Sequence, residues 1–300
     1  MNEIKTSFSD WIKAGRITAS ALDYGVSLAK PGVSVSFILE SIEKKILDSG
    51  AEIGFPAQMS VNETAAHYCP YQGNDIILAK GDVAKLDIGA SVNGAIGDTA
   101  RTISLSDNND MLLEASKEAL KKAISIVKPG VTLSEIGRVI NSEISKRGYS
   151  PVKNLSGHGI SRYHIHTDPT IPNYDNGSEI ALTENQIIAI EPFATSGRGF
   201  VKEQGEPGVF MIGIPKPQRN KNARRILNYI SKYKNLPFAK RWLEKEFGDS
   251  EIKIGLSFLL RDKSIIAYPP LVDIDKKKVA QFEHTMIVTK NGAKITTLLE

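Results

Sequence analysis

Five side chains with the chemistry of metal ligands are spread over the C-terminal two-thirds of the sequence. Four are carboxylates and one is an imidazole: Asp87, Asp98, His158, Glu191 and Glu283. A cluster of this kind can hold two divalent cations close together, and such a pair turns water into a nucleophile at neutral pH. The residue types therefore predict hydrolytic chemistry, provided that the fold brings the five together.

The two aspartates lie in LDIGASVNGAIGDTART, which has the pattern of a β-hairpin. Asn93-Gly94 is a strong signal for a two-residue type I′ turn. With that turn Asp98 faces Gly89, and Asp87 lies two residues from Gly89 on the same face of the hairpin. Both carboxylates would project into one space, where like charges require a cation between them. The alternative is two surface aspartates on an exposed edge, or a bulge that changes the register.

The other three ligand-type residues are weaker signals when each is taken alone. His158 lies between glycines in LSGHGI, and Gly-His-Gly is more often a turn than a metal site. Glu191 ends an apolar run, and Glu283 lies within AQFEHTMIV. Buried carboxylates in such surroundings need a partner or a metal. The five together therefore predict a metal centre.

Six motifs resemble those of one family, the type 2 methionine aminopeptidases: NETAAHYCP, LDIGASVNGAIGDTART, LSGHGISRYHIH, IAIEPFAT, AYPPL and QFEHT. The resemblance covers essentially the whole chain. It implies an α/β (α+β) fold of the creatinase-like pita-bread type, with an internal pseudo-two-fold repeat. The chain lacks the long, charge-rich N-terminal extension of eukaryotic members, so it resembles the archaeal ones.

The resemblance also implies roles for the five ligand-type residues. Asp87 would chelate one metal ion, while Asp98 and Glu283 would bridge two. His158 and Glu191 would complete the second site, with Glu191 also shuttling a proton from the bridging water. Cobalt, manganese, iron and zinc all remain open as the metal, because carboxylate-rich sites accept several of them.

Two further histidines match the family, and the resemblance makes them catalytic together with Glu191. His166 would donate a hydrogen bond to the carbonyl oxygen that becomes an oxyanion. His67 would contact the amide nitrogen or the residue after the scissile bond. The implied substrate-binding residues are Phe55, His67, Ile165, His166 and Tyr268, and all of these except His166 would line the methionine pocket. Phe55 and Ile165 could equally be ordinary core residues, and His164 and His284 are left as ordinary histidines.

The predicted function is removal of the initiator methionine from nascent proteins, with a small second residue preferred. One alternative is a Xaa-Pro aminopeptidase or prolidase, which shares the fold and a similar ligand set. The other is a catalytically inactive relative that binds ribosomes or RNA. The predicted partners are the N-terminal methionine of nascent chains and, transiently, the ribosome; no membrane contact is expected, and the chain is expected to be a monomer.

A gapless similarity between two segments 98 positions apart indicates the elements that position these residues. LAKPGVSVSFILESIEKKILDSG and IVKPGVTLSEIGRVINSEISKRG share Pro-Gly, a Ser or Thr in N-cap position, isoleucines four apart and a closing glycine. Thr132 and Glu135 form the pattern of a capping box. Each half is therefore predicted to contain two helices around a Pro-Gly turn, followed by strands. The predicted strands lie at 83–88, 94–103, 187–190 and 282–289.

A long interval between Glu191 and Glu283 predicts an insert at 197–268 in a catalytic domain formed by 1–196 and 269–300. Within it, two helices broken at Leu236-Pro237 are expected, followed by an apolar stretch, with a winged-helix type as the candidate architecture. The segment carries 15 Lys and Arg against 7 Asp and Glu. Such an excess could contact ribosomal RNA, although a solvated lysine-rich surface is the commoner meaning of a charge run.

The bulk composition is that of a globular protein of 300 residues, with 41% hydrophobic residues and a net charge of +4. Met1–Arg16 lacks the apolar stretch of a signal peptide. The one cysteine, Cys69, excludes an intramolecular disulfide and suits a reducing compartment. A cytoplasmic location is therefore expected.

Overall fold

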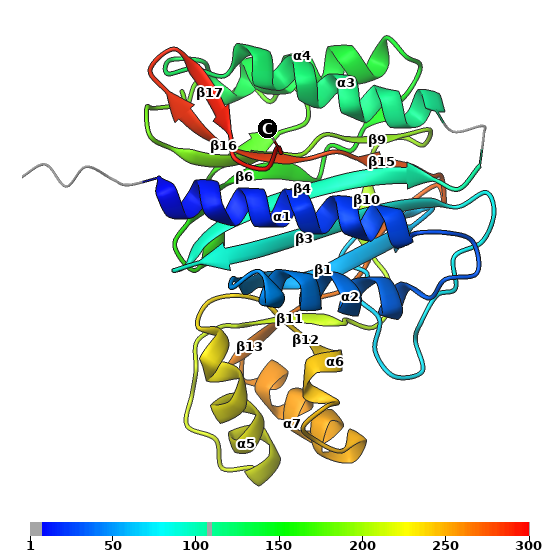
Figure 1. Cartoon of the computed structure of the whole chain (residues 1–300), viewed down its shortest axis with the longest axis vertical. Coiled ribbons are helices and arrows are strands. Elements are labelled where there is room, and N and C mark those ends of the chain that lie inside the picture. Colours follow the sequence, from blue (N-terminus) through cyan, green and yellow to red (C-terminus); the bar gives the residue numbers. More distant parts are fainter. Residues whose placement is uncertain (1–7, 107–109, 300) are drawn as a thin grey trace, which may run out of the picture.

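Two antiparallel sheets, each covered by a helix pair, lie against each other in the computed structural model, which describes residues 8–106 and 110–299 (Figure 1). Part of the segment predicted to lack a signal peptide, residues 1–7, lies outside the described residues. Within the described ranges, no helix combines the length and the apolar character that crossing a membrane requires.

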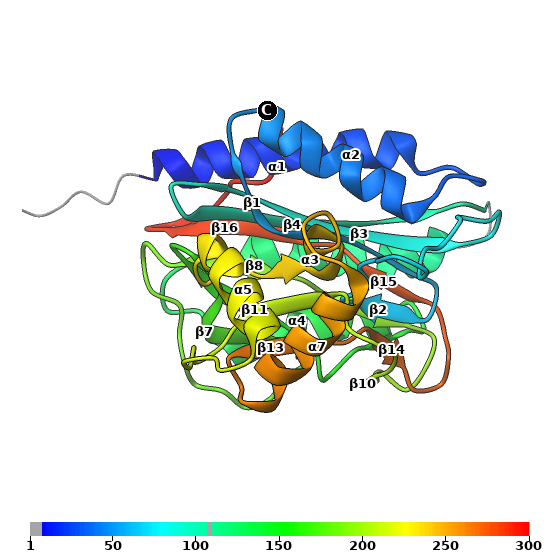
Figure 2. The same ribbon diagram turned by 90° about the horizontal axis from the view of Figure 1, so that it is seen from below.

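The first half is a three-stranded sheet with two helices on one face. The order of its strands is β1-β3-β4, and its elements are α1 (Ser9–Leu28), α2 (Val35–Asp48), β1 (Glu52–Val61), β3 (Val83–Val92) and β4 (Ala95–Ser104). Figure 2 shows both helices on the same side of the sheet. Ile38, Ile42 and Ile46 on α2 are fully buried against the sheet, because residues four apart share one helix face.

The second half has a five-stranded sheet with α3 and α4 packed on it. The strand order is β17-β16-β8-β6-β7, and the elements are α3 (Asp110–Ile126), α4 (Leu133–Ser145), β6 (Ser156–Ser161), β7 (His164–Pro172), β8 (Ile187–Ile190), β16 (His284–Thr289) and β17 (Gly292–Ile295). A smaller sheet of order β15-β9-β5 comprises β15 (Val279–Gln281), β9 (Phe193–Thr195) and β5 (Ser150–Pro151). The predicted strand at 282–289 is two residues shorter, since Phe282 and Glu283 lie between β15 and β16.

The two helix pairs have matching ends, as their sequences predict. The Ser34 side chain caps α2, and Thr132 caps α4 with a complete capping box. Gly32 and Gly130, in the Pro-Gly turns, have φ of 87° and 88°, and each donates its N–H to the carbonyl of a leucine further along the chain. That conformation is readily available only to glycine. The local equivalence of the two segments extends to these hydrogen bonds, while an internal duplication stays a prediction.

The hairpin register agrees with the prediction from Asn93-Gly94. Asn93 and Gly94 have φ of 50° and 82°, as a type I′ turn requires. Gly89 is the partner of Asp98, and β3 and β4 continue pairing without a bulge from Val92 to Val83. β3 is longer than predicted, and β4 begins and ends one residue later than predicted. Asp98 is 3% exposed, so the alternative of a surface edge is wrong for this residue.

The segment 197–268 contains more regular structure than predicted. It begins with β10 (Val201–Glu203), which pairs with β14 (Leu271–Asp273) beyond the segment, and β14 pairs with β2 (Thr64–Ala66). The remainder has its own small core and sheet, of order β12-β11-β13. Its elements are β11 (Val209–Ile212), α5 (Lys221–Ile230), the 3-10 turn η1 (Ser231–Tyr233), β12 (Phe238–Ala239), α6 (Lys240–Leu243), α7 (Asp249–Arg261) and β13 (Ile265–Tyr268).

Two expectations for this segment need correction. The second predicted helix is a single turn, α6, and the apolar stretch that follows contains the three-turn helix α7. Ile252, Leu256 and Leu259 are buried on one side of α7, and their spacing of four and three is the signal that identifies an amphipathic helix. The segment protrudes at one end of the molecule (Figure 1). The domain boundaries and the winged-helix type stay predictions.

Candidate metal centre and substrate cavity

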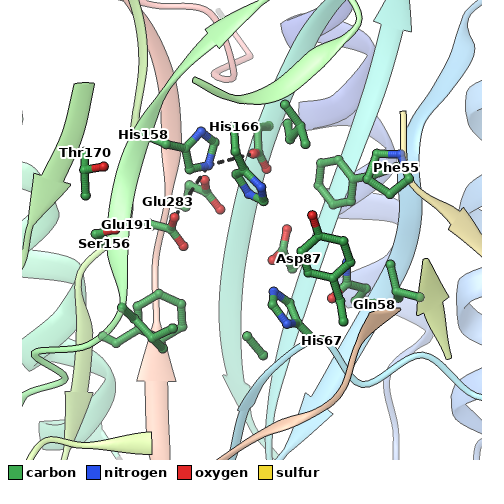
Figure 3. A pocket seen from close by; sticks show the side chains of 18 of the residues that line it. Phe55, Gln58, His67, Asp87, Ser156, His158, His166, Thr170, Glu191 and Glu283 are labelled. Atoms are coloured by element: carbon green, nitrogen blue, oxygen red, sulfur yellow. Dashed lines mark ion pairs between the residues drawn. The ribbon is translucent and has the colours of Figure 1, made fainter. Parts of the chain in front are cut away.

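The five ligand-type residues come from both halves and line one cavity of about 560 Å³ (Figure 3). Asp87 and Asp98 project from β3 and β4, His158 from β6. Glu191 directly follows β8, and Glu283 directly precedes β16. Because β8, β6 and β16 belong to one sheet and the hairpin to the other, the cluster exists only where the halves meet.

The cluster is tight and largely buried. His158 Nε2 lies 3.5 Å from Asp98 Oδ2 and 3.6 Å from Glu191 Oε1. One ligand atom from each of Asp98, His158 and Glu283 lies within 4.8 Å of the others. The other imidazole nitrogen, Nδ1, is 3.1 Å from the Gly159 carbonyl. A proton on Nδ1 donated to that carbonyl leaves the Nε2 lone pair directed at the carboxylates.

Burial and mutual repulsion keep protons on the carboxyl groups when no cation is bound. Burial raises the pKa of Asp87 to about 7. Burial, followed by the neighbouring carboxylates, raises the pKa of Asp98, Glu191 and Glu283 well above their usual range. Burial also lowers the pKa of His158 to about 3, so its ring is neutral at pH 7, as a metal ligand must be.

Several oxygens of the cluster lack a partner of their own. Among the described residues, Asp87 Oδ1, Asp98 Oδ1 and Glu283 Oε1 are buried without a hydrogen bond. An unsatisfied buried polar group costs about 1–3 kcal/mol, and the three residues that carry these oxygens line one cavity. Carboxylate oxygens and a neutral imidazole are the donor set that divalent manganese, iron, cobalt and zinc accept. These residues therefore fit divalent cations.

Hydrogen bonds between the two sheets hold the ligands in register. Thr285 Oγ1 accepts from the Asp98 N–H and donates to the Asp98 carbonyl, both at 2.8 Å. Thr99 Oγ1 donates to the Glu283 carbonyl at 2.6 Å. Strands β4 and β16 are thereby tied together at the two carboxylates predicted to bridge the metals.

Sequence reasoning missed one amide of this site. Gln281 Nε2 donates to Glu191 Oε2 at 3.2 Å and to Glu283 Oε2 at 3.5 Å. The available signal was the spacing in AQFEHT, which places Gln281 two residues before Glu283 and hence on the same side of an extended chain. Gln281 orients the two glutamates with its amide N–H groups.

The residues predicted to contact substrate line the same cavity: Phe55, His67, Ile165, His166 and Tyr268. His166 packs edge-on against His158 with ring centroids 4.5 Å apart, and His67 packs edge-on against Tyr268 at 5.6 Å. Phe55 and Ile165 are both about 5% exposed and belong to a buried apolar cluster, so they serve the core and the cavity wall together. His164 and His284 are not among the lining residues.

Both cavity histidines are neutral at pH 7. Burial, and secondarily the proximity of His166, lowers the pKa of His67 to about 4. The protein atoms around His166 lower its pKa as well, although its side chain is exposed to the open cavity. A neutral imidazole can donate one hydrogen bond to a polarised carbonyl without adding charge.

Two facing sheets surround a buried cluster of carboxylates and a histidine, and the chain belongs to metallopeptidase family M24, whose model matches residues 11–290. It is 44% identical over 288 residues to a methionine aminopeptidase from Pyrococcus horikoshii, covering 95% of this chain and 98% of that relative. The predicted family is confirmed.

Solved structures show the same fold. A thermophilic Arx1 matches with a TM-score of 0.85 and 17% identity over 99% of this chain and 91% of that one. A methionine aminopeptidase from Thermotoga maritima matches with a TM-score of 0.73 and 22% identity over 100% and 99% of the two chains. At these identities the comparison establishes the fold alone, and it confirms the predicted α/β fold of pita-bread type.

Proposed function

We propose that this protein is a metal-dependent methionine aminopeptidase that removes the initiator methionine from nascent proteins. The observation that carries the proposal is the buried cluster of carboxylates and His158 in one cavity with His67 and His166. The 44% identity to the Pyrococcus horikoshii methionine aminopeptidase supports the reaction and the substrate.

In this proposal the five ligand-type residues hold two divalent cations. Asp87 would hold one cation, His158 and Glu191 would hold the other, and Asp98 and Glu283 would serve both. Bound there, the cations would supply Lewis acidity and a nucleophilic water at neutral pH. The three unpartnered carboxylate oxygens support cation binding by this cluster, because a buried carboxylate needs a partner or a metal.

The chain's own residues would bind the peptide and move its protons. His166 donates a hydrogen bond to the scissile carbonyl oxygen, which needs a fixed donor as negative charge develops on it. His67 contacts the amide nitrogen on the leaving side. Glu191 would accept a proton from water in its ionised form, because bound cations would displace the proton that burial keeps on it in the metal-free protein.

The methionine side chain would lie against Phe55, Ile165 and Tyr268. These residues form a wall of aromatic and aliphatic groups within the cavity. An unbranched, flexible thioether fills such a pocket without leaving a polar group unpaired. A small second residue is expected beside His67, where Tyr268 packs against the ring and limits the space.

Hydrolysis of Met-Ala-Ser and Met-Leu-Ser by metal-free protein tests the proposal, with Mn²⁺, Fe²⁺, Co²⁺ or Zn²⁺ added back singly. Metal-dependent release of methionine, from the alanine peptide only, is the expected result. Cleavage of an Ala-Pro peptide without methionine release would instead identify a proline-specific peptidase. If none of the three peptides is cleaved, the result would favour a catalytically inactive binding protein.

The proposal extends to location and partners. We expect a cytoplasmic monomer that contacts the ribosome transiently through exposed cations on α5 and the following turn, namely Lys221, Arg224, Lys232 and Lys234. Charge reversal to glutamate at all four positions should reduce co-sedimentation with ribosomes and leave Met-Ala-Ser hydrolysis intact. Unchanged co-sedimentation would mean that these cations form a solvated surface.

A further inference from the structure

An uncharged amide lies beside the carboxylate cluster and is not one of its ligands. Gln58 on β1 is the direct ladder partner of Asp87 on β3. Residues directly opposite each other in an antiparallel pair project to the same face, with Cβ atoms about 5 Å apart. Both side chains line the cavity, and Figure 3 shows them next to each other.

The Gln58 amide has a hydrogen-bonding requirement that the described part of the chain does not meet. Gln58 is only 6% exposed, and its Oε1 is buried without a hydrogen-bond partner among the described residues. Gln281 Oε1 is also buried without a partner among the described residues, but Gln281 does not line the cavity, and its Nε2 donates to two glutamates. A divalent cation would satisfy Asp87, but a single neutral amide oxygen beside it calls for a hydrogen-bond donor.

A peptide with N-terminal methionine offers few donors near this position. The methionine side chain has only a thioether, which is a weak acceptor. The backbone N–H of the scissile bond is assigned above to His67. The remaining donor of the first residue is the α-amino group, which is also the group that distinguishes a chain end from any internal peptide.

We propose that Gln58 recognises the free N-terminus by accepting a hydrogen bond from the substrate α-amino group at Oε1. This inference rests on the proposed aminopeptidase function and adds a substrate-binding residue to it. A neutral acceptor contributes this hydrogen bond without adding a further negative charge to the four carboxylates.

Three hydroxamates test the contact, because a hydroxamate anchors each of them at the metals. They are methionine hydroxamate, norleucine hydroxamate, which lacks the sulfur, and 4-(methylthio)butanohydroxamate, which lacks the α-amino group. Dissociation constants are measured by calorimetry on the metal-loaded wild type and on Gln58→Met, a substitution of similar length without hydrogen bonding. Gln204→Met, at an exposed position outside the cavity, is the matched control.

Gln58→Met should weaken the two amino hydroxamates about tenfold, the size of one hydrogen bond, and change the des-amino compound less than twofold. An equal loss for all three ligands, or no loss for any, would overturn the proposal. Loss for methionine hydroxamate alone would also overturn it, because the contact would then be to sulfur.

Two further measurements separate the causes of failure. Without ligand, Gln58→Met should keep the metal content and the melting temperature of the wild type, because the substitution removes an acceptor that has no partner. A melting temperature lower by more than about 4 °C would show that Oε1 has a structural partner and would contradict the inference. Wild-type protein that releases no methionine from Met-Ala-Ser would sink the proposed function and the inference with it. If the wild type is active and Gln58→Met changes the dissociation constants of all three hydroxamates equally, only the inference about Gln58 is refuted.

Discussion

Four carboxyl groups and a neutral imidazole line one cavity with largely buried side chains. The pKa values of the carboxyl groups are displaced by burial first and by one another second. Each oxygen of the cluster therefore matters, because a buried charged group needs a partner or a metal. Substitutions that keep the shape and change only the charge are the sharpest tests at this scale.

Replacing Asp98 by asparagine removes one carboxylate oxygen at the centre of the cluster. We expect peptide hydrolysis to fall more than about 10³-fold, because a ligand that contacts both cations is lost. Metal content by atomic emission should fall as well. Asp48→Asn, on the exposed end of α2, should change neither quantity. Near-normal turnover of the Asp98 variant would rule out the dinuclear arrangement.

His166→Ala tests the oxyanion donor. Its kcat should fall at a cost of about 3 kcal/mol, typical of one lost donor, with KM little changed. His164→Ala, two residues away on β7 and outside the cavity, is the control and should keep both constants. A change in KM alone would give His166 a role in substrate binding.

At the scale of elements, a buried ion pair joins α2 to the segment 197–268. Glu43 accepts hydrogen bonds from Arg241, from Trp242 Nε1 at 2.9 Å and from the Ala57 N–H at 3.1 Å. Burial raises the pKa of Glu43, although the Arg241 guanidinium acts in the opposite direction. Arg241 also donates to the buried thiol of Cys69, two residues from His67. The body and the segment therefore share a buried charged contact, in addition to the exposed pair of Lys245 with Glu40.

Arg241→Met should lower the free energy of unfolding by about 3–5 kcal/mol, because it leaves Glu43 buried without its cation. Urea denaturation measures this. Arg225→Met removes an exposed pair with Glu251 and should cost less than about 1 kcal/mol. Equal losses in the free energy of unfolding for the two substitutions would show that the buried pair stabilises the fold no more than the exposed pair does.

At the scale of the whole molecule, the metal centre couples pH to stability. The unfolded carboxyl groups ionise near pH 4, whereas Asp98, Glu191 and Glu283 keep protons to much higher pH in the metal-free folded state. A raised folded pKa means that the folded state binds more protons, so stability falls as pH rises towards that pKa. Above its pKa of about 7, Asp87 is ionised in the folded state too, so it no longer changes the stability as pH rises further.

The melting temperature of metal-free protein should therefore fall between pH 7.5 and 8.5. Lys85, whose pKa burial lowers to about 7, acts in the opposite direction, but it is one group against the three carboxyl groups. The histidines with lowered pKa values also act in the opposite direction near pH 6.5, where the unfolded rings titrate, and their contribution is complete above about pH 7.5. Saturating Mn²⁺ should raise the melting temperature at pH 8.5 and flatten the slope, as calorimetry would show. Identical slopes with and without metal would mean that the cluster is not the metal site.

Local features of the fold could be read directly from the sequence. Asn93-Gly94 determined the register that pairs Gly89 with Asp98, and Thr132 with Glu135 determined the start of α4. These features depend on hydrogen bonds between residues a few positions apart, so neighbouring residue types suffice to predict them. The types of the five ligand residues likewise pointed to hydrolysis before any position in space was known.

Only the tertiary structure decided which distant groups meet. The Gln281 amide against Glu191 and the unpaired oxygen of Gln58 beside Asp87 arise because strands that are not consecutive in the chain pair side by side within a sheet. Such contacts depend on which strands become neighbours, and no local pattern encodes that choice. The sequence by itself thus determined the chemistry available to this protein, and the packing of its two halves decided which atoms are left to bind a ligand.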